Sequence, residues 1–440
     1  MKMKLKSMKI EGLFNTFNYD LHFDTPERYL ILTGINGYGK TTILNMISSL
    51  AEKDLFYFYT IPFTLLSFVF DNENTLLITS EKNNTGVGDQ HIDGGKRLSF
   101  SWKNAKAQET ASFVIDDWII KKILENPMLL RRVIDRGQRD NYESKAFYQR
   151  TKDAGLLEAI MNVTGKNADQ LMMQLDSFHA TYLQAERTVE CRYLRPKDMV
   201  PNLEYRESKW YIIDHLETEF KSLLHDEYMN YVENAQHVDA KFIDKAISTD
   251  VVYDNEQYDI AAEKLRARMA NLERMGLIPL SDIKPFDATN AKMLTAYLMT
   301  QNEKLDYYNP LLDKITLFKS LIAERGFINK EMLVTQKDGF RFRVEGNGFI
   351  SLDSLSSGEQ NGVVMLYTLV FRVQNDTMLL IDEPENSLHV LWQKRIMKSI
   401  EMIANIKNLF VVIATHSPQI IGSRWENTYD LTEAIGEDGE

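Results

Sequence analysis

The chain has almost no cysteine: Cys191 is the only one among its 440 residues. A single cysteine excludes an intrachain disulfide and a metal site built from several thiolates. Low-complexity tracts and internal repeats are also absent. With 44% hydrophobic and 26% charged residues, the composition is that of a globular protein rather than a disordered chain. The length allows two or three domains, or one domain with large insertions.

Long hydrophobic runs are missing as well. The longest uncharged run, residues 55–70, is shorter than the roughly 20 residues that a membrane helix needs, and it contains Pro62. The first ten residues hold four lysines and no apolar stretch of signal-peptide length. We therefore expect a cytoplasmic protein that does not contact a membrane.

The chain has no excess of positive charge. Lys and Arg total 51 against 63 Asp and Glu, which gives a formal net charge of -12. Binding of DNA over a mainly basic surface is therefore not expected, whereas a local basic groove stays compatible with the composition. Basic clusters occur at 131–139 and 264–268, but such clusters on helices are usually solvated faces.

Residue patterns predict an α/β chain with strands at both ends and a mainly helical middle. The N-terminal part has alternating or short apolar runs typical of strands, and residues 112–180 and 209–325 look mostly helical. Within the latter, apolar residues from Leu294 to Ile315 recur at spacings of four and three, and Pro310 should kink or end that helix. Both a helical arm and a compact helical subdomain fit this pattern. Residues 55–103 look β-rich, with a loop at 83–96. Further strands are predicted at 29–33, 332–335, 340–344, 378–381 and 410–414, and further helices at 358–373 and 391–405.

A glycine-rich segment, Gly34-x4-Gly39-Lys40-Thr41, lies between a predicted strand and a predicted helix, the context that a phosphate-binding loop requires. Glycines let backbone N–H groups approach phosphate oxygens, Lys40 reaches the β- and γ-phosphates, and the Thr41 hydroxyl binds Mg²⁺. The alternative is a glycine turn that happens to precede a helix. The predicted ATP-binding residues of this segment are Gly34, Asn36, Gly37, Tyr38, Gly39, Lys40, Thr41 and Thr42.

An acidic pair follows the apolar strand predicted at 378–381. Asp382, at the carboxyl end of that strand, is placed to hold Mg²⁺. Glu383 is placed to orient and activate the attacking water. Alone, an apolar run that ends in two acids is common and mostly structural, but here it follows a phosphate loop.

Two further motifs complete a set whose order resembles the ABC ATPase superfamily: Leu-Ser-Ser-Gly-Glu at 355–359 and His416 in Thr-His-Ser-Pro. The resemblance implies an α/β fold, an ABC ATPase head assembled from N- and C-terminal parts with a large, mainly helical insertion. The head would consist of residues 1–205 and 329–440, and the insertion of residues 206–328.

The resemblance also implies a site shared by two copies of the chain. In that superfamily the signature of one subunit caps the γ-phosphate bound by the other, while the switch histidine, here His416, contacts it within its own subunit. Lys40, Glu383 and His416 would then be the catalytic residues. Alone, the signature is an ordinary helix start capped by serine, and Ser357 departs from the glycine usual in transporters. The signature residues carried over are Ser356, Ser357, Gly358 and Glu359.

Three more residues have two interpretations each. Gln184 could contact Mg²⁺ or the water as the glutamine of a Q-loop, and Arg187 could touch phosphate or Glu383. A surface strand with a salt bridge explains both equally well. His389 fits either a contact at the dimer face or simple packing.

The long stretch between Lys40 and Leu355 and the lack of a membrane segment resemble the soluble branch of SMC-, Rad50-, RecF- and OLD-type heads. The amino-acid sequence of residues 382–393 and 414–421 is similar to that of the ATPase subunits of the PARIS and Septu anti-phage systems. We therefore expect an ATP- and Mg²⁺-dependent homodimer, or higher homo-oligomer, that senses DNA or a phage protein. The alternatives are a DNA-clamping ATPase of repair or chromosome maintenance, and a scaffold in which ATP is structural.

We expect the effector to be a separate protein, a nuclease; the alternative is that no nuclease is involved and the ATPase itself is the output. The stretch after His416 is too short for the Toprim nuclease that follows OLD-type heads, and its acids lie in a tail rather than at strand ends. The middle of the chain has neither a histidine cluster of the HNH kind nor the cysteines for a zinc-supported one.

Overall fold

The structure is a computed structural model. The residues that it describes are 2–83, 95–116, 167–185, 189–194, 206–279, 281–324, 327, 329–344, 346, 348–386 and 390–433. Arg187 and His389, the arginines at 131–139, and residues 434–440 lie outside these ranges, so the predictions made for them stay predictions.

The strands are β1 (Leu5–Leu13), β2 (Phe17–His22), β3 (Tyr29–Thr33), β4 (Leu65–Phe70), β5 (Thr75–Asn83), β6 (Gly95–Lys103), β7 (Glu109–Asp116), β8 (Ala180–Leu183), β9 (Val189–Leu194), β10 (Arg206–Tyr211), β11 (Lys330–Thr335), β12 (Gly339–Val344), β13 (Gly348–Ile350), β14 (Met378–Asp382), β15 (Phe410–Ala414) and β16 (Thr428–Asp430).

The α-helices are α1 (Lys40–Ala51), α5 (Asn167–Leu175), α6 (Ile212–Ala240), α7 (Phe242–Ser248), α8 (Asn255–Arg274), α9 (Ala291–Asp306), α10 (Asn309–Glu324), α11 (Ser357–Tyr367), α12 (Val390–Lys407) and α13 (Pro418–Ile421). Short 3₁₀ turns occur at Leu55–Thr60, Ala288–Asn290, Leu352–Ser354 and Trp425–Asn427, and a π-helical turn at Thr368–Arg372.

The chain divides into two compact units. The first unit combines Met1–Trp210 with Arg372–Glu440, and the second is Tyr211–Phe371. The first unit therefore joins the two ends of the chain around the second. The predicted insertion is 206–328, so the second unit also contains the signature segment that the sequence analysis groups with the C-terminal part of the head.

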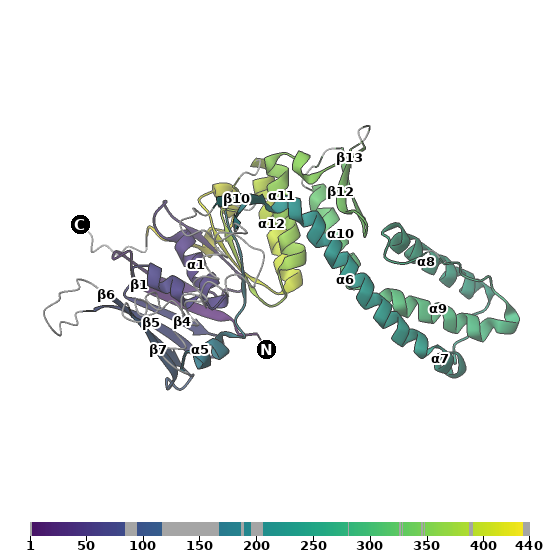
Figure 1. The fold of residues 1–440 in the computed structure, drawn as a ribbon, viewed down its shortest axis with the longest axis horizontal. Coiled ribbons are helices and arrows are strands. Elements are labelled where there is room, and N and C mark those ends of the chain that lie inside the picture. Colours follow the sequence, from purple (N-terminus) through teal and green to yellow (C-terminus); the bar gives the residue numbers. More distant parts are fainter. Residues whose placement is uncertain are drawn as a thin grey trace. The chain divides into compact units, whose positions relative to one another are not determined.

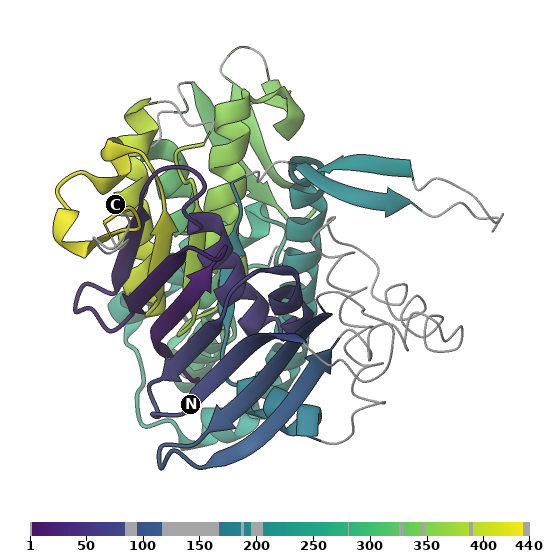
Figure 2. The same cartoon turned by 90° about the vertical axis from the view of Figure 1, so that its left-hand side faces the viewer.

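Two sheets and the helix α1 form the core of the first unit, which also contains α5, α12 and α13. The antiparallel sheet has the order β2-β1-β4-β5-β6-β7, and its strands lie side by side in purple to blue in Figure 2. The second sheet has the order β16-β3-β15-β14-β8, and all its neighbours are parallel. Buried residues of α1, such as Ile43 and Ile47, share one core with residues of both sheets (Figure 1). This burial fixes the start of α1 relative to the strands that flank it.

The strand β7 corrects the prediction of helix from residue 112 onward. Ala111, Phe113 and Ile115 are buried and alternate with residues that are not. That period of two puts one apolar row on the core face, as a strand requires. The pairing of β7 with β6, including Phe113 stacked on Phe100 at 4.6 Å, stabilises the strand.

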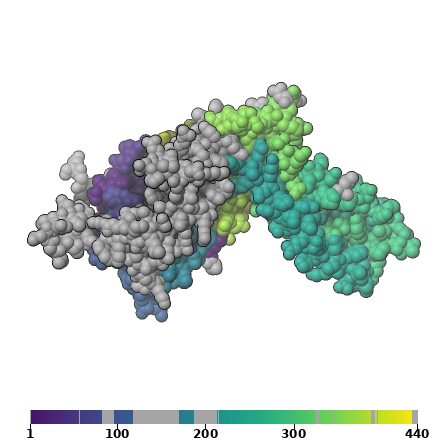
Figure 3. All heavy atoms as spheres, in the orientation of Figure 1, coloured from purple at the N-terminus to yellow at the C-terminus, as the bar shows by residue number. Residues whose placement is uncertain are grey.

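Helices make up most of the second unit. The 29-residue α6 contacts α9 and β12, and α8 packs against α9. In Figure 3 the atoms of this teal and green part of the chain form a continuous surface. The predicted effect of Pro310 is confirmed: α9 ends at Asp306, and α10 begins at Asn309 with the proline in its first turn, where no N–H is missed.

An aromatic cluster in the second unit holds the signature helix α11. Tyr367 of α11 lies 6.0 Å from both Phe220 of α6 and Phe340 of β12, and 6.2 Å from Phe318 of α10, measured between ring centroids. All four rings are buried. In the described part of the chain, no helix is long and apolar enough to cross a bilayer.

Candidate nucleotide site

The parallel sheet of the first unit positions the candidate site. β3, β8, β14 and β15 run in the same direction, so their carboxyl ends meet at one edge. The glycine loop follows β3, Asp382 ends β14, His416 lies two residues after β15, and Gln184 follows β8 directly. Segments that are far apart in the sequence therefore meet at one edge, which is where open parallel sheets bind ligands.

The glycine loop has the backbone that a phosphate cradle needs. Gly34, Gly37 and Gly39 have φ angles of 133°, 92° and 91°. At Gly39 a side chain would be strained because φ is positive, and its Cβ would lie 2.9 Å from Leu13 Cδ2, which would have to move. No side chain caps the start of α1. The first N–H groups of the helix are therefore not occupied by a capping side chain, and they favour an anion.

Lys40 is buried, with 7% of its surface exposed. Its Nζ donates to the carbonyl oxygens of Gly34, at 2.7 Å, and Ile35, at 3.3 Å. These bonds hold the ammonium group inside the loop that it closes. The loop thus combines a positive charge with backbone donors, which is suited to phosphate.

The glycine loop and the start of α1 also contain residues with uncharged side chains. The backbone carbonyl of Tyr38 accepts a hydrogen bond from the Tyr19 hydroxyl at 2.8 Å, and the Tyr38 ring lies 5.1 Å from that of Phe17. Asn36 is exposed and Thr42 is half-buried. The strands β1 and β2 thus anchor one side of the loop.

Thr41 and Asp382, the two predicted Mg²⁺ ligands, are in contact. The Thr41 hydroxyl donates to Asp382 Oδ2 at 2.9 Å, and the Tyr182 hydroxyl donates to the same oxygen at 3.3 Å. Asp382 is only 4% exposed. A hydroxyl and a carboxylate side by side are oxygen donors of the kind that Mg²⁺ prefers, so the residues fit the ion.

Glu383 and His416 form a second pair beside the first. His416 Nδ1 lies 3.0 Å from Glu383 Oε1, and the Glu383 N–H donates to the Ala414 carbonyl at 2.8 Å. The φ of Glu383 is +46°, a left-handed conformation that is uncommon for a side-chain-bearing residue. His416 is exposed, whereas Glu383 is about three-quarters buried.

A buried acid, Glu385, lies beside this pair and affects the pKa of Glu383. Glu385 is 8% exposed and accepts a hydrogen bond from the fully buried Thr415 hydroxyl. Burial raises the pKa of Glu383 above its ordinary value, and so does the neighbouring Glu385 carboxylate, while His416 opposes the shift. Ligand atoms of Glu383, Glu385 and His416 all lie within 4.8 Å of one another. A carboxylate with a raised pKa and a histidine partner is typical of a proton-transfer site.

Gln184 lies at the same edge as the predicted Mg²⁺ ligands. It is exposed, and no hydrogen bond joins it to Thr41 or Asp382 within the described residues. Its role therefore stays a prediction. Asn386, which follows Glu385, donates to the Ala185 carbonyl at 3.3 Å and so ties the end of β8 to the turn after β14.

The signature lies in the second unit and is described there by itself. Ser356 caps α11 in a capping box: its Oγ accepts from the Glu359 N–H at 3.4 Å, and its own N–H donates to Glu359 Oε2 at 2.9 Å. Lys330 forms an ion pair with the other Glu359 oxygen. Burial would raise the pKa of Glu359, but the hydrogen bonds from Lys330 and Ser356 outweigh it and lower the pKa. Ser356 and Ser357 are exposed at the helix start.

Comparison with known proteins gives one family match. The model of the family described as AAA ATPase domain matches residues 3–421. None of the curated proteins matches. Among solved structures, the Smc head domain with an extended coiled coil bound to the C-terminal domain of ScpA, from Pyrococcus furiosus, has 10% identity and a TM-score of 0.36 over 97% of this chain and 93% of that chain. The SMC head domain from Thermotoga maritima has 9% identity and a TM-score of 0.34 over 97% and 94%.

Proposed function

The chain belongs to the AAA ATPase domain family, and on this basis we propose that it binds ATP with Mg²⁺ and hydrolyses it to ADP and phosphate at the carboxyl edge of the parallel sheet. The observation that carries the proposal is the convergence of two pairs there. Thr41 contacts Asp382 at 2.9 Å, and Glu383 contacts His416 at 3.0 Å.

The glycine loop binds the phosphates in this proposal. Backbone N–H groups at the start of α1 and the Lys40 ammonium face the negative charge of the β- and γ-phosphates. Thr41 and Asp382 would hold Mg²⁺, which when bound neutralises charge on phosphate oxygens. Tyr182, which donates to Asp382, orients that carboxylate.

Glu383 acts on the attacking water. Its carboxylate accepts a proton as the water oxygen forms a bond to the γ-phosphorus and the bond to the ADP oxygen breaks. His416 is held beside Glu383 and donates to a γ-phosphate oxygen. The raised pKa of Glu383 makes the carboxylate a stronger base than an exposed glutamate.

The signature completes the site from a second copy of the chain. Ser356 and the N-terminus of α11 present a hydroxyl, N–H groups and the positive end of a helix dipole. Such a surface suits the γ-phosphate bound by another copy, which would make ATP part of the homodimer interface. The support is the motif order together with the exposure of Ser356 and Ser357.

Replacement of the loop lysine tests ATP binding. Lys40→Ala should weaken ATP binding by about 100-fold or more, because it removes the ammonium group of the loop. Lys53→Ala, just after the other end of α1, is the matched control and should bind like the wild type. Calorimetry on both variants measures this, and an unchanged ATP affinity in Lys40→Ala would contradict the assignment of the loop.

The biological role that we propose is that of a sensor and scaffold in anti-phage defence, controlling a separate nuclease. This proposal is supported by the amino-acid sequence of residues 382–393 and 414–421, which is similar to that of the PARIS and Septu ATPase subunits. Cells that carry the gene with its genomic neighbours should lose protection against phage when Glu383→Gln replaces the wild type. Protection that is absent from the start, together with salt-sensitive binding to a 40-mer duplex, would favour a DNA clamp instead.

A further inference from the structure

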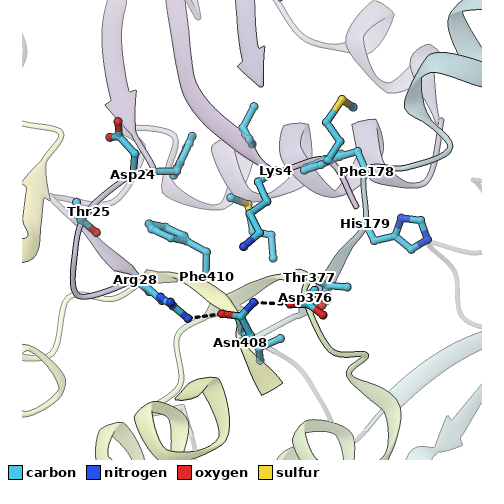
Figure 4. A pocket seen from close by; sticks show the side chains of 15 residues that line it. Lys4, Asp24, Thr25, Arg28, Phe178, His179, Asp376, Thr377, Asn408 and Phe410 are labelled. Atoms are coloured by element: carbon cyan, nitrogen blue, oxygen red, sulfur yellow. Dashed lines mark hydrogen bonds between the residues drawn. The ribbon is translucent and has the colours of Figure 1, made fainter. Parts of the chain in front are cut away.

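A cavity lies at the opposite edge of the parallel sheet from the candidate nucleotide site. It encloses about 200 Å³ in the first unit. Its walls come from the start of β1, from the turn between β2 and β3, and from the residues that precede β8, β14 and β15 (Figure 4). It therefore opens at the amino ends of the strands and shares no residue with the nucleotide site.

One wall of the cavity is polar and carries two cations. The Arg28 guanidinium donates to Asn408 Oδ1, and the Asn408 amide donates to Asp376. In Figure 4 the Lys4 ammonium points into the space beside the Phe410 ring, above the Asn408–Asp376 pair. Neither Lys4 nor Arg28 forms an ion pair with a carboxylate in the described part of the chain. Two cationic groups therefore face the cavity without a protein counter-ion.

The two acids that line the cavity do not neutralise these cations. Asp376 is engaged by the amide of Asn408. In Figure 4 the carboxylate of Asp24 points away from the Lys4 ammonium. An anionic group placed between Lys4 and Arg28 would meet both cations, and hydrogen bonds between charged groups are stronger than those between neutral ones.

A phenylalanine wall, formed by Phe23, Phe178 and Phe410, also lines the cavity, and Phe23 and Phe410 pack edge to face with their centroids 6.0 Å apart. Phenylalanine rings accept a further ring in the same edge-to-face or offset manner. A cavity of about 150 Å³ holds one benzene ring, so the volume here suits a ligand with a single ring and a short polar group.

The backbone of the polar wall is unusual. Arg28, Asp376 and Asn408, which form the polar wall, all have positive φ, at 59°, 55° and 55°. Arginine rarely adopts this conformation, and strained backbone tends to occur at functional sites. His179 also lines the cavity, but in Figure 4 its ring points away from Lys4 and Arg28.

We propose that this cavity binds a small carboxylate that bears one aromatic ring. The carboxylate accepts hydrogen bonds from Lys4 and Arg28, and the ring lies against the phenylalanine wall. The site is separate from ATP binding, and its occupation does not depend on the proposed hydrolysis.

Phenylacetate is the probe that tests the proposal on the full chain. Its few heavy atoms limit the expected dissociation constant to about the millimolar range. By calorimetry and ligand-observed NMR it should bind at least about fivefold more tightly than neutral phenylacetamide and cationic phenethylamine. Failure to bind at about 10 mM, or tighter binding of phenethylamine, would overturn the proposal.

Two lysine variants connect the binding to the cavity. Lys4→Gln should weaken phenylacetate binding by about tenfold, the value of one charge-assisted hydrogen bond. Lys6→Gln is the matched control, because Lys6 lies two residues further along the chain, pairs with Glu73 and does not line the cavity. Equal binding by the two variants would place the phenylacetate elsewhere and overturn the proposal. Both lysines are exposed, so neither change should affect folding.

Discussion

At the scale of single residues, the neighbours of Glu383 have opposite effects on its pKa. Burial and the negative charge of Glu385 raise its pKa, and the hydrogen-bonded His416 lowers it, with a net shift upward. A carboxylate must be ionised before it can accept a proton. Hydrolysis should therefore increase as the pH rises through the pKa of Glu383, which lies above the usual range of a glutamate.

The variant Glu385→Gln tests this electrostatic coupling. It removes a negative charge next to Glu383, so the pKa of Glu383 falls and the acidic limb of the rate profile moves to lower pH. The amide oxygen still accepts the hydrogen bond from Thr415, which preserves the local contact. The rate of phosphate release against pH measures the shift. Glu426→Gln, an exposed acid elsewhere, should leave the limb in place, and an unmoved limb in Glu385→Gln would contradict the coupling.

Only part of the candidate site could be predicted from the sequence. Lys40 and Asp382 belong to local motifs whose flanking strands and helices are visible in the residue pattern. Tyr182 and Glu385 were missed as site residues. The hydroxyl of Tyr182 reaches Asp382 only because β8 pairs with β14, a pairing of segments about 200 residues apart. Glu385 follows the Asp382-Glu383 pair closely in the sequence. Its effect on Glu383 depends on its burial, and the sequence alone does not show that an acid in a turn is buried.

At the scale of elements, the edge of one sheet brings the site together. β3, β14 and β15 each end in a functional loop, and burial of α1 between the two sheets fixes the glycine loop. Most of these elements could be predicted, because apolar runs bounded by glycine or acids are strong local signals. β7 could not, because its alternating pattern is short and is followed by a helix-like composition.

The capping box of α11 is a prediction at this scale. Ser356→Ala removes the hydroxyl that accepts from the Glu359 N–H, and it should cost about 1 kcal/mol in the first turn of the helix. Hydrogen exchange of the Glu359 and Gln360 amides should become about fivefold faster. Ser357→Ala, one position inside the helix, is the control. Equal exchange in the two variants would show that the serine does not stabilise the turn.

At the scale of the whole molecule, the residues of the proposed nucleotide site belong to two different units of the chain. The glycine loop, the acids and His416 lie in the first unit, and the signature lies in the second. The proposal that the site is shared therefore requires that the signature of one copy of the chain meets the glycine loop of another. The sequence indicates the order of the motifs, but it cannot show which copy supplies the signature, because pairing of subunits leaves no local pattern.

Mixing two inactive variants answers that question. Ser356→Arg should block the γ-phosphate of the partner, and Lys40→Ala should empty its own site, so each homodimer is inactive. A mixed dimer has one site with both defects and one intact site. An equal mixture should regain about a quarter of the wild-type phosphate release if one site works alone. No gain, with mixed dimers shown by mass spectrometry, would count against sites shared between copies that act independently.

The most direct test of the central claim, that this edge of the sheet hydrolyses ATP, is one measurement on Glu383→Gln. The amide cannot take a proton from water, while the glycine loop, Thr41 and Asp382 remain. We expect ATP affinity within about threefold of the wild type and phosphate release at least about 100-fold slower, within the usual contribution of a general base. Glu383→Gln that binds ATP and releases phosphate at the wild-type rate would contradict the account.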